Sequence, residues 1–329
     1  MKLLVLSARE VVQALPMAAA VEGMKRAFGQ LSAGKATVPL RSHVNVPQHN
    51  GTSLIMPAYL AESGDLAVKI VSVFPNNAAQ NLPVINGVVL AFDHKTGQPV
   101  ALMDGGALTA IRTGAASGAA TDLLARSDAH TVAIFGSGVQ ARTQLEAVCT
   151  VRPIETVRVY SPDQAHAVAF AAEMAGHGPI PAAIEVMGSA EAAAAEADII
   201  CTATSSGEPV FPGTSLKPGV HINAVGVFMT SMREVDTLTI QQSLVVVDEY
   251  DAMRAEAGDI MIPLEAGEID EGHIHAELGE IVNGTKSGRT NPEQITFFKS
   301  VGVAVQDAVA ASLAVRGAAA HNLGIYISI

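Results

Sequence analysis

Residues 131–141 contain a glycine spacing suited to holding a phosphate group. The stretch reads TVAIFGSGVQA, so an apolar segment is followed by Gly136 and Gly138 and then by Ala141. In a strand–turn–helix unit the first glycine permits the tight turn and the second lets the backbone approach a pyrophosphate. The small third residue lets the helix pack closely on the strand. A helix starting at Val139 would offer free N–H groups and its positive dipole end to phosphates. The spacing therefore predicts a dinucleotide-binding loop.

Three cations in the first third of the chain form a second group with chemical potential. Arg41 occurs in PLRSHVNV, Lys69 in LAVKIVSV and Arg112 in ALTAIRTGAAS. Lys69 and Arg112 stand inside apolar runs, where an unpaired buried charge is strongly unfavourable.

Two interpretations of these cations are open. In the structural one, the charges pair with Asp104, Asp93 or Glu62 while the side-chain stems are buried. In the functional one, they bind the carboxylate of a substrate, for which the planar arginine side chain is well suited. Because the chain carries a net charge of −12, three such cations together favour the anion-binding interpretation.

The end of the strand after the glycine loop bears on the choice of cofactor. It reads YSPD over residues 160–163, and a carboxylate that binds the ribose of NAD usually stands at this strand tip. Here the tip carries Ser161, whereas Asp163 follows a Ser-Pro pair that is typical of a helix start. Ser161 and Arg142 are therefore candidates for contacting a 2′-phosphate. This pattern favours NADPH (NADP), with NADH (NAD) as the alternative.

The elements that must position these groups alternate regularly from Thr131 onward. Helical patterns run from Val139 to about Val148, from Gln164 to Ala175, and around Glu191–Glu196, and each comes after a strand-like segment. The apolar, strand-like segments are 131–135, 156–160, 182–187, 198–204, 221–226 and 243–249. Short apolar strands alternating with helices predict an α/β fold, a Rossmann-type doubly wound parallel sheet.

The remainder of the chain has a different rhythm. SLIMPAYL, LAVKIVSVFP, VINGVVLAFD and PVALMDG are strand-like segments without crossover helices, so an antiparallel or mixed sheet is expected. A long helical pattern is expected over about 295–320 and should return to the N-terminal part. We therefore predict a discontinuous α+β domain of residues 1–115 with 306–329, and a dinucleotide-binding domain of residues 116–305.

Composition excludes several classes of function. The net charge of −12 argues against nucleic-acid binding, which needs clustered lysines and arginines. No apolar run reaches the ~20 residues that a bilayer crossing needs, so no membrane partner is expected. Cys149 and Cys201 lie in apolar segments and are interpreted as small buried side chains, which fits a cytoplasmic location.

Histidine patterns give weaker signals. His273 and His275, with Glu277 and Glu280, lie in EIDEGHIHAELGE, which is interpreted as an acidic surface loop entering a helix rather than a metal site. No GxSxG, CxxC or HExxH motif supports a hydrolase or a zinc enzyme. His43, two residues from Arg41 in an extended segment, is a candidate proton donor.

Four quoted stretches together resemble the ornithine cyclodeaminase/mu-crystallin family. They are MDGGALTAIRTGAASGAATDLLAR (103–126), VAIFGSGVQARTQLEA, HINAVG with MREVD (221–236), and ITFFKSVGVAVQD (295–307). The resemblance runs through nearly the whole chain in order. It implies a Rossmann domain and a discontinuous substrate and dimerisation domain built from both chain ends, hence a homodimer.

The resemblance also implies roles for individual residues. Arg41, Lys69 and Arg112 match the residues that hold the substrate carboxylate, and Lys69 and Arg112 are the catalytic candidates. The matches to the family's cofactor contacts are Gly136, Gly138, Val139, Gln140, Thr202, Ala203, Thr204, Ser205, Val225, Gly226, Val227, Ser300, Val301 and Gly302.

One departure from the cyclodeaminases points to a different reaction. They carry an aspartate two residues after the NAVG glycine and a lysine four residues further on, where this chain has Phe228 and Met232. Phenylalanine cannot act as a base, whereas it can contact a flat uncharged ring; ordinary loop packing is the other interpretation.

The resemblance then implies NAD(P)H-dependent reduction of a cyclic imino acid, Δ1-pyrroline-2-carboxylate or Δ1-piperideine-2-carboxylate, to L-proline or L-pipecolate. The alternatives are a lyase of the ornithine cyclodeaminase or hydroxyproline dehydratase type, an alanine-type dehydrogenase, and a non-catalytic NADPH-dependent binding protein.

Overall fold

The computed structural model describes residues 2–329, which divide into two compact units. One unit contains the described residues up to Arg112 together with Val303–Ile329, and the other contains Thr113–Gly302. The chain passes between them within helix α3 (Gly105–Leu124). The predicted boundaries, after residues 115 and 305, lie three residues from those of the structure. The roles assigned to the two parts stay predictions.

The discontinuous unit is built on a mixed sheet. Its strands lie in the order β16-β1-β7-β6-β5-β4-β2, with β3 also paired to β4. β1 and β7 are parallel, and the other pairs are antiparallel. The elements of this unit are β1 (Lys2–Leu6), α1 (Ala8–Ala14), α2 (Met17–Ser32), β2 (Ala36–Thr37), β3 (Ser42–Val46), η1 (Pro47–His49), β4 (Gly51–Leu60), β5 (Asp65–Val73), η2 (Pro75–Gln80), β6 (Ile85–Phe92), β7 (Pro99–Asp104), α11 (Ala304–His321) and β16 (Ile325–Ser328).

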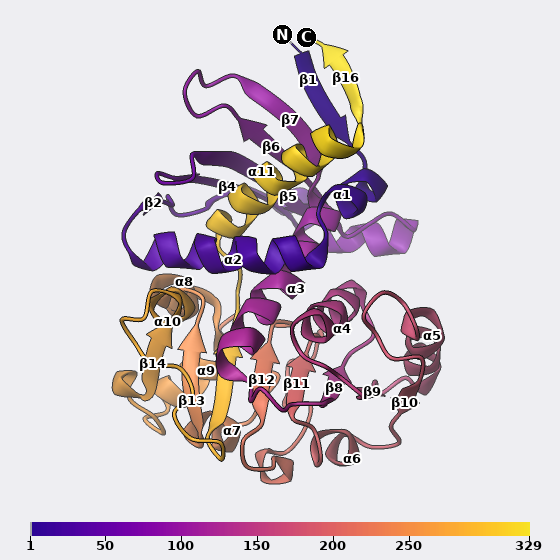
Figure 1. The fold of residues 1–329 in the computed structure, drawn as a ribbon, viewed down its shortest axis with the longest axis vertical. Coiled ribbons are helices and arrows are strands. Elements are labelled where there is room, and N and C mark those ends of the chain that lie inside the picture. Colours follow the sequence, from indigo (N-terminus) through magenta and orange to yellow (C-terminus); the bar gives the residue numbers. More distant parts are fainter. Residues whose placement is uncertain (1) are drawn as a thin grey trace. The chain divides into compact units, whose positions relative to one another are not determined.

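Strand alternation decides which side of this sheet is buried. Helix α11 lies across β4, β5 and β6 (Figure 1). Cross-strand partners Met56, Lys69, Val89 and Met103 form a row of buried side chains on one face. Because successive side chains point to opposite faces of a strand, Lys69 is placed in the covered core although it is charged.

The other unit contains a parallel sheet. Its strands follow the order β10-β9-β8-β11-β12-β15-β13-β14, and every pair is parallel (Figure 1). The elements are β8 (Thr131–Phe135), α4 (Val139–Val151), β9 (Thr156–Tyr160), α5 (Gln164–Met174), β10 (Ile184–Val186), α6 (Ala190–Ala194), β11 (Ile199–Thr202), η3 (Gly213–Ser215), β12 (His221–Ala224), α7 (Thr237–Gln241), β13 (Ser243–Val247), α8 (Tyr250–Glu256), α9 (Gly258–Glu265), η4 (Glu271–His273), β14 (Ile274–Glu277), α10 (Leu278–Val282) and β15 (Ile295–Lys299).

Helices cover both faces of the parallel sheet. Val132 and Ile134 of β8 belong to a core shared with α4 and α5, whereas Ala133 and Phe135 belong to a second core shared with α6 to α9. Both faces of the strands are therefore apolar, which explains their continuous hydrophobic runs. The predicted fold class, a doubly wound Rossmann-type sheet with a second α+β part, is confirmed.

One long helix predicted from the sequence is wrong in its first part. Residues 295–299 form strand β15, between β12 and β13, and the helix begins only at Ala304. The reason is that ITFFK, which is apolar except for Thr296 and Lys299 and contains β-branched and aromatic side chains, is as compatible with a buried central strand as with a helix. Gly302, at a φ of 85°, then turns the chain before α11. Strands β14 and β16 were not anticipated.

Two further sequence predictions concern burial and membranes. Cys149 and Cys201 are buried and unpaired, as expected. Among the helices formed by residues 2–329, none combines the length and the apolar character needed to cross a bilayer.

Candidate active site

The first glycine of the loop is required by the protein's own geometry. Gly136 follows β8 at a φ of 103°, a conformation that side chains with a Cβ rarely adopt. A Cβ here would lie 2.5 Å from the carbonyl oxygen of Ala203, in the segment after β11. Gly136 N–H also donates to Tyr160 O at 3.0 Å, so the loop is fixed between β9 and β11.

The second glycine has no such internal requirement. Gly138 is the N-cap of α4 with a φ of −79°, and a Cβ placed on it would meet no protein atom within 4 Å. The chain's own packing therefore does not require a glycine at this position. Val139, the first residue of α4, is 65% exposed although it is apolar. An open glycine at a helix N-terminus fits the pyrophosphate of a dinucleotide.

The sheet order locates the loop at a switch point. β8 is flanked by β9, which follows it in the chain, and by β11, which the chain reaches only after β10, so the strand order reverses direction at β8. Ligands of open α/β sheets bind outside the carboxyl ends of the strands at such a point. The fit of a nicotinamide dinucleotide is therefore supported by both the loop and the topology.

The predicted cofactor contacts outside the loop share the same edge of the sheet. Thr202, Ala203 and Thr204 end or follow β11, and Gln140 lies in the first turn of α4. Val225 and Val227 follow β12, and Ser300 and Gly302 follow β15. Since these strands are parallel, their carboxyl ends lie together.

A buried acid holds the last of these segments. Asp248, directly after β13, accepts hydrogen bonds from Ser300 Oγ at 3.1 Å, Val301 N at 2.8 Å and Gly302 N at 2.7 Å. Burial raises the pKa of this carboxyl, while the three donors act against that rise. Sequence reasoning missed Asp248; an acid at the end of the apolar segment SLVVVDE was the available signal.

The residues predicted to select the cofactor have defined partners. Asp163 caps α5, accepting from Ala165 N at 2.9 Å, which confirms it as a helix-start acid. Ser161 is buried. Arg142 donates to both carboxylate oxygens of Glu173, at 2.8 and 2.5 Å, and to Ser137 O at 2.6 Å. Its guanidinium is thus already engaged in holding the glycine loop.

The two buried cations of the discontinuous unit converge on one carboxylate. Lys69 Nζ lies 2.7 Å from Asp307 Oδ2, and Arg112 Nε lies 3.2 Å from Asp307 Oδ1. Arg112 Nη1 also donates to Gln306 Oε1 at 2.9 Å. Lys69, Arg112 and Asp307 are all nearly inaccessible to solvent.

Arg41 contributes to the same electrostatic environment. Burial lowers the pKa of Lys69 to about 8; Asp307 opposes this, while the positive charges of Arg112 and Arg41 lower the pKa further. Arg41 immediately precedes β3, and His43 lies in that strand with an exposed side chain. Lys69 and Arg112 are thus brought together on Asp307, and the positive charge of Arg41 is near enough to act on Lys69.

Asp307 and Gln306 are site residues that sequence reasoning missed. The structural interpretation offered Asp104, Asp93 or Glu62 as partners, and the structure supplies Asp307 of α11 instead. Both residues stand at the end of the quoted stretch SVGVAVQD. A buried acid and amide one turn into an otherwise apolar helix were the available signal.

Phe228 lies in the loop after β12, at the carboxyl edge of the parallel sheet. Its side chain is 52% exposed, and that of Met229 is 49% exposed. These two side chains therefore do not serve as core packing of the unit. The histidines of the acidic segment have structural partners instead: His273 Nε2 contacts Ile240 O at 2.7 Å, and His275 Nε2 contacts Ser287 O at 2.8 Å.

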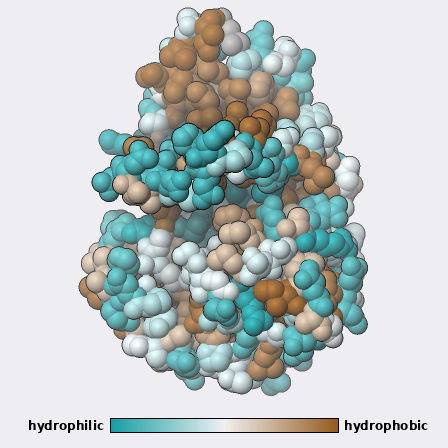
Figure 2. Space-filling view, turned by 180° about the vertical axis from the view of Figure 1, so that it is seen from behind, coloured by the Kyte–Doolittle hydropathy of each residue, from teal (hydrophilic) through white to brown (hydrophobic). Residues whose placement is uncertain are grey.

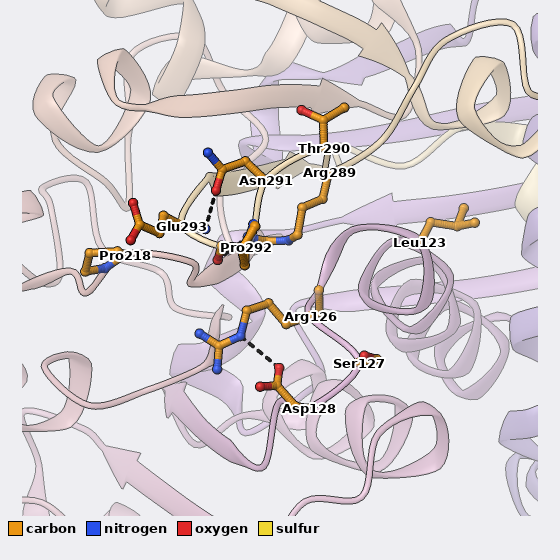
Figure 3. Close-up of a pocket in the computed structure, with 11 residues that line it drawn as sticks. Leu123, Arg126, Ser127, Asp128, Pro218, Arg289, Thr290, Asn291, Pro292 and Glu293 are labelled. Atoms are coloured by element: carbon orange, nitrogen blue, oxygen red, sulfur yellow. Dashed lines mark hydrogen bonds and ion pairs between the residues drawn. The ribbon is translucent and has the colours of Figure 1, made fainter.

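A pocket of 910 Å³ in the parallel-sheet unit is lined by residues such as Arg126, Asp128 and Arg289 (Figure 3). Its lining residues precede β8, β12 and β15, at the amino edge of the parallel sheet, and include none of the predicted site residues. Arg126 within it is paired with Asp128 at 2.9 Å, and Arg289 Nε donates to Leu124 O at 2.7 Å. Because these cations are already engaged, we assign the pocket no part in the site.

Known proteins resemble the chain over nearly its full length. Delta(1)-pyrroline-2-carboxylate reductase of Bacillus cereus is 40% identical, with 98% of each chain covered. The structure of Thermococcus litoralis Delta(1)-pyrroline-2-carboxylate reductase in complex with NADH and L-proline is 47% identical, with a TM-score of 0.92 over 98% of this chain and 99% of that one. An archaeal alanine dehydrogenase dimer with bound NAD is 32% identical, with a TM-score of 0.91 and all of both chains covered. Residues 1–321 match the family model for ornithine cyclodeaminase and mu-crystallin. The chain therefore belongs to the ornithine cyclodeaminase/mu-crystallin family.

Proposed function

We propose that the protein is an NAD(P)H-dependent imine reductase that converts Δ1-pyrroline-2-carboxylate to L-proline. The observation that carries this proposal is the buried cluster of Lys69, Arg112 and Asp307, in a chain 40% and 47% identical to two such reductases. In the reaction the imine carbon gains a hydride and the ring nitrogen gains a proton. When bound, the reduced nicotinamide supplies the hydride.

The carboxylate of the imino acid is the group that the cluster would bind. Lys69 and Arg112 contribute two positive charges to the cluster, and Asp307 contributes one negative charge. Arg41 is the third predicted contact of the substrate carboxylate, and its charge acts on Lys69. Two buried cations sharing one acid leave positive charge uncompensated, which is costly away from water. A substrate carboxylate supplies the missing charge, and the arginine fork orients it.

The ring nitrogen requires a proton from the protein, from water or from a substrate that is already protonated. Lys69 is the group of the cluster that can release one near neutral pH, because the pKa of its ammonium is about 8. The cluster would then combine anion binding with the supply of a proton.

The nicotinamide dinucleotide would be held by the glycine loop and the start of α4. Both NADH and NADPH are proposed as donors. The strand tip carries Ser161 in place of the carboxylate that usually binds the ribose of NAD, and Asp163, two residues on, caps α5. Arg142 gives NADPH less support than the sequence suggested, since its guanidinium is bound to Glu173.

Phe228 is proposed to contact the ring of the imino acid. Its half-exposed apolar side chain stands where the cyclodeaminases carry an aspartate, so the chain lacks the base for cyclodeamination at this position. An apolar contact suits an uncharged ring. The same apolar contact would suit the ring of Δ1-piperideine-2-carboxylate, which is therefore the second proposed substrate.

A homodimer is proposed to form through the open face of the mixed sheet. Ile55, Ile70 and Val88 are cross-strand partners on the face opposite Lys69, and each is at least 37% exposed. Figure 2 shows hydrophobic surface gathered on the discontinuous unit, which holds this sheet. A contiguous apolar sheet face is typical of a surface that another subunit covers. The expected cytoplasmic location stays a prediction, consistent with two unpaired cysteines.

The test is a cofactor-oxidation assay with both rings. Loss of the reduced-nicotinamide absorbance of NADH and NADPH is followed with Δ1-pyrroline-2-carboxylate and Δ1-piperideine-2-carboxylate, and L-proline is identified by chiral chromatography. The proposal requires stoichiometric oxidation with the pyrroline. Ammonia release from ornithine without net cofactor change would indicate a lyase, and oxidation that needs pyruvate and ammonia would indicate an alanine dehydrogenase.

A further inference from the structure

The function proposed above leaves the MREVD stretch, residues 232–236, without a role. Its glutamate, Glu234, is completely buried and belongs to neither hydrophobic core of the parallel sheet. Burying a carboxylate is unfavourable unless hydrogen bonds and counter-charges compensate it. The contacts of Glu234 show what its burial achieves.

Both oxygens of Glu234 bind the carboxyl ends of neighbouring strands. Oε1 accepts from Thr204 N at 2.7 Å and Thr204 Oγ1 at 2.8 Å. Oε2 accepts from Thr202 Oγ1 at 2.9 Å and Gly226 N at 2.8 Å. One side chain therefore joins the segment after β11 to the segment after β12.

The two segments approach each other so closely that a side chain would not fit between them. A Cβ on Gly226 would collide with the carbonyl oxygen of Thr204 and with Glu234 Oε1. Gly136 of the glycine loop makes a similar approach to Ala203 on the other side of β11. The ends of β8, β11 and β12 are thus packed into one continuous edge.

A buried ion pair between Asp259 and Lys299 contacts the backbone of Glu234. Asp259 Oδ1 accepts from Glu234 N at 2.6 Å, and Asp259 Oδ2 lies 2.6 Å from Lys299 Nζ. Lys299 Nζ also donates to Val227 O at 2.8 Å, which extends the network to β15. Burial raises the pKa of Glu234, and the positive charge of Lys299 opposes the rise.

We propose that Glu234 is a positioning residue for the dinucleotide, which it serves by fixing the segments after β11 and β12. The inference rests on the proposed function, because that function places the cofactor at this edge. Its physical basis is that a binding site must hold its contacting atoms to within about 0.5 Å, and side-chain hydrogen bonds to loops provide this. The network touches Thr202, Thr204 and Val227, which match cofactor contacts of the family.

An amide cannot replace the carboxylate without breaking the arrangement. Each oxygen of Glu234 accepts from a backbone N–H, those of Thr204 and Gly226. In Glu234→Gln, one of the two N–H groups must face an NH₂ group in either orientation of the amide. Because the unmatched N–H must move away from the NH₂ group, the segment that carries it shifts, and the Kd for NADH should rise about 10- to 100-fold, or about 1.4–2.7 kcal/mol.

Asp198 provides a matched control. It is equally buried, accepts from the backbone N–H groups of His130 and Thr131 at 3.0 Å each, and pairs with Lys217 at 2.8 Å. It lies in the same unit but at the amino end of β8, away from the cofactor edge. Asp198→Asn should therefore lower the thermal stability of the protein without changing the Kd for NADH.

The experiment measures the Kd for NADH by nicotinamide fluorescence, and Tm, for the full chain and its variants. Asp259→Asn, which weakens the support of the Glu234 backbone and alters no predicted cofactor contact, serves if Glu234→Gln does not fold, and should raise the Kd less. Weaker NADH binding in Glu234→Gln or Asp259→Asn, with unchanged binding in Asp198→Asn, supports the inference. Equal effects of the variants at equal loss of stability overturn it while leaving the proposed function intact. A wild-type protein that binds neither NADH nor NADPH would overturn both.

Discussion

Two buried charge clusters, one in each unit, differ in sign and in how they are satisfied. In the discontinuous unit, Lys69 and Arg112 share Asp307, so positive charge is in excess. In the parallel-sheet unit, Lys299 pairs with Asp259, and its positive charge also acts on nearby Glu234, so two acids accompany one cation.

The two clusters differ in which groups balance the excess charge. The surplus acid of the second cluster is satisfied by the chain itself, through N–H and O–H groups that donate to Glu234. In the first cluster the two cations share one acid, and Arg112 also donates to the neutral amide of Gln306, which adds no negative charge. Buried charge completed internally indicates positioning, whereas buried charge that needs an outside counter-ion indicates binding.

The largest expected effect is that of Arg112→Ala. Removing a buried, hydrogen-bonded cation from a bound carboxylate costs about 4 kcal/mol, which is about a 10³-fold loss of kcat/KM for the imino acid. Lys35→Ala is the matched control, since Lys35 is an exposed cation of the same unit paired with Glu62. Steady-state kinetics on both variants check this, and comparable losses would contradict the binding role of the cluster.

Asp307→Asn should destabilise the fold by about 3 kcal/mol, because two buried cations lose their shared acid. Chemical denaturation measures the change in the free energy of unfolding. Adding L-proline should recover part of this loss, since its carboxylate supplies negative charge to the cluster. A variant as stable as the wild type would show that Asp307 does not compensate Lys69 and Arg112.

The two glycines of the loop should separate folding from binding. Gly138→Ala should keep the Tm, because its Cβ meets no protein atom, yet lower kcat/KM for NADH about 10²-fold by displacing the pyrophosphate. Gly136→Ala should lower the Tm, because of its φ of 103° and the nearby Ala203 oxygen. Thermal melts and kinetics on the pair check this; unchanged NADH kinetics in Gly138→Ala would contradict the loop's role.

The positive cluster should also reveal itself in the pH dependence of substrate binding. Lys69 is protonated below its pKa of about 8 and loses its charge above it. The KM for the imino acid should therefore rise about fivefold from roughly pH 8 to roughly pH 9, as the protonated fraction of Lys69 falls. In Asp307→Asn this rise should begin at lower pH, since the acid that holds the proton on Lys69 is gone. A KM profile identical in the two proteins would count against the pairing.

The same lysine affects stability in a defined direction. Because its pKa is lowered from 10.5 to about 8 in the folded state, the folded protein loses this proton first. The contribution of Lys69 to the free energy of unfolding should therefore become more favourable as pH rises from about 8 to 10.5, and be constant below.

The smallest effect is expected at Asp163. Asp163→Ala removes the cap of α5 and should cost about 1 kcal/mol of stability. The ratio of kcat/KM for NADPH to that for NADH should stay unchanged, because this carboxylate serves the helix and not the ribose. A shift of that ratio toward NADPH would show instead that the Asp163 carboxylate contacts the cofactor.

Much of the fold followed from local patterns. The apolar strands of the parallel sheet, the glycine loop and the helix-start role of Asp163 depend on neighbours within a few residues, which sequence periodicity reports directly. The helix predicted over 295–320 failed at its start because an apolar run such as ITFFK satisfies a buried helix and a buried strand equally well. Its position between β12 and β13 in the parallel sheet makes this segment a strand, β15.

By itself, the sequence determined the fold class, the glycine loop and the identity of the unusual buried cations. The tertiary structure alone decided which distant groups each buried acid contacts. Asp307 contacts Lys69 and Arg112, and Glu234 contacts the segments after β11 and β12. The physical reason is that an ion pair or a buried hydrogen bond depends on where distant segments pack. By sequence alone, several acidic residues are equally plausible partners of a buried cation. Only the path of the backbone brings one of them within contact distance of it.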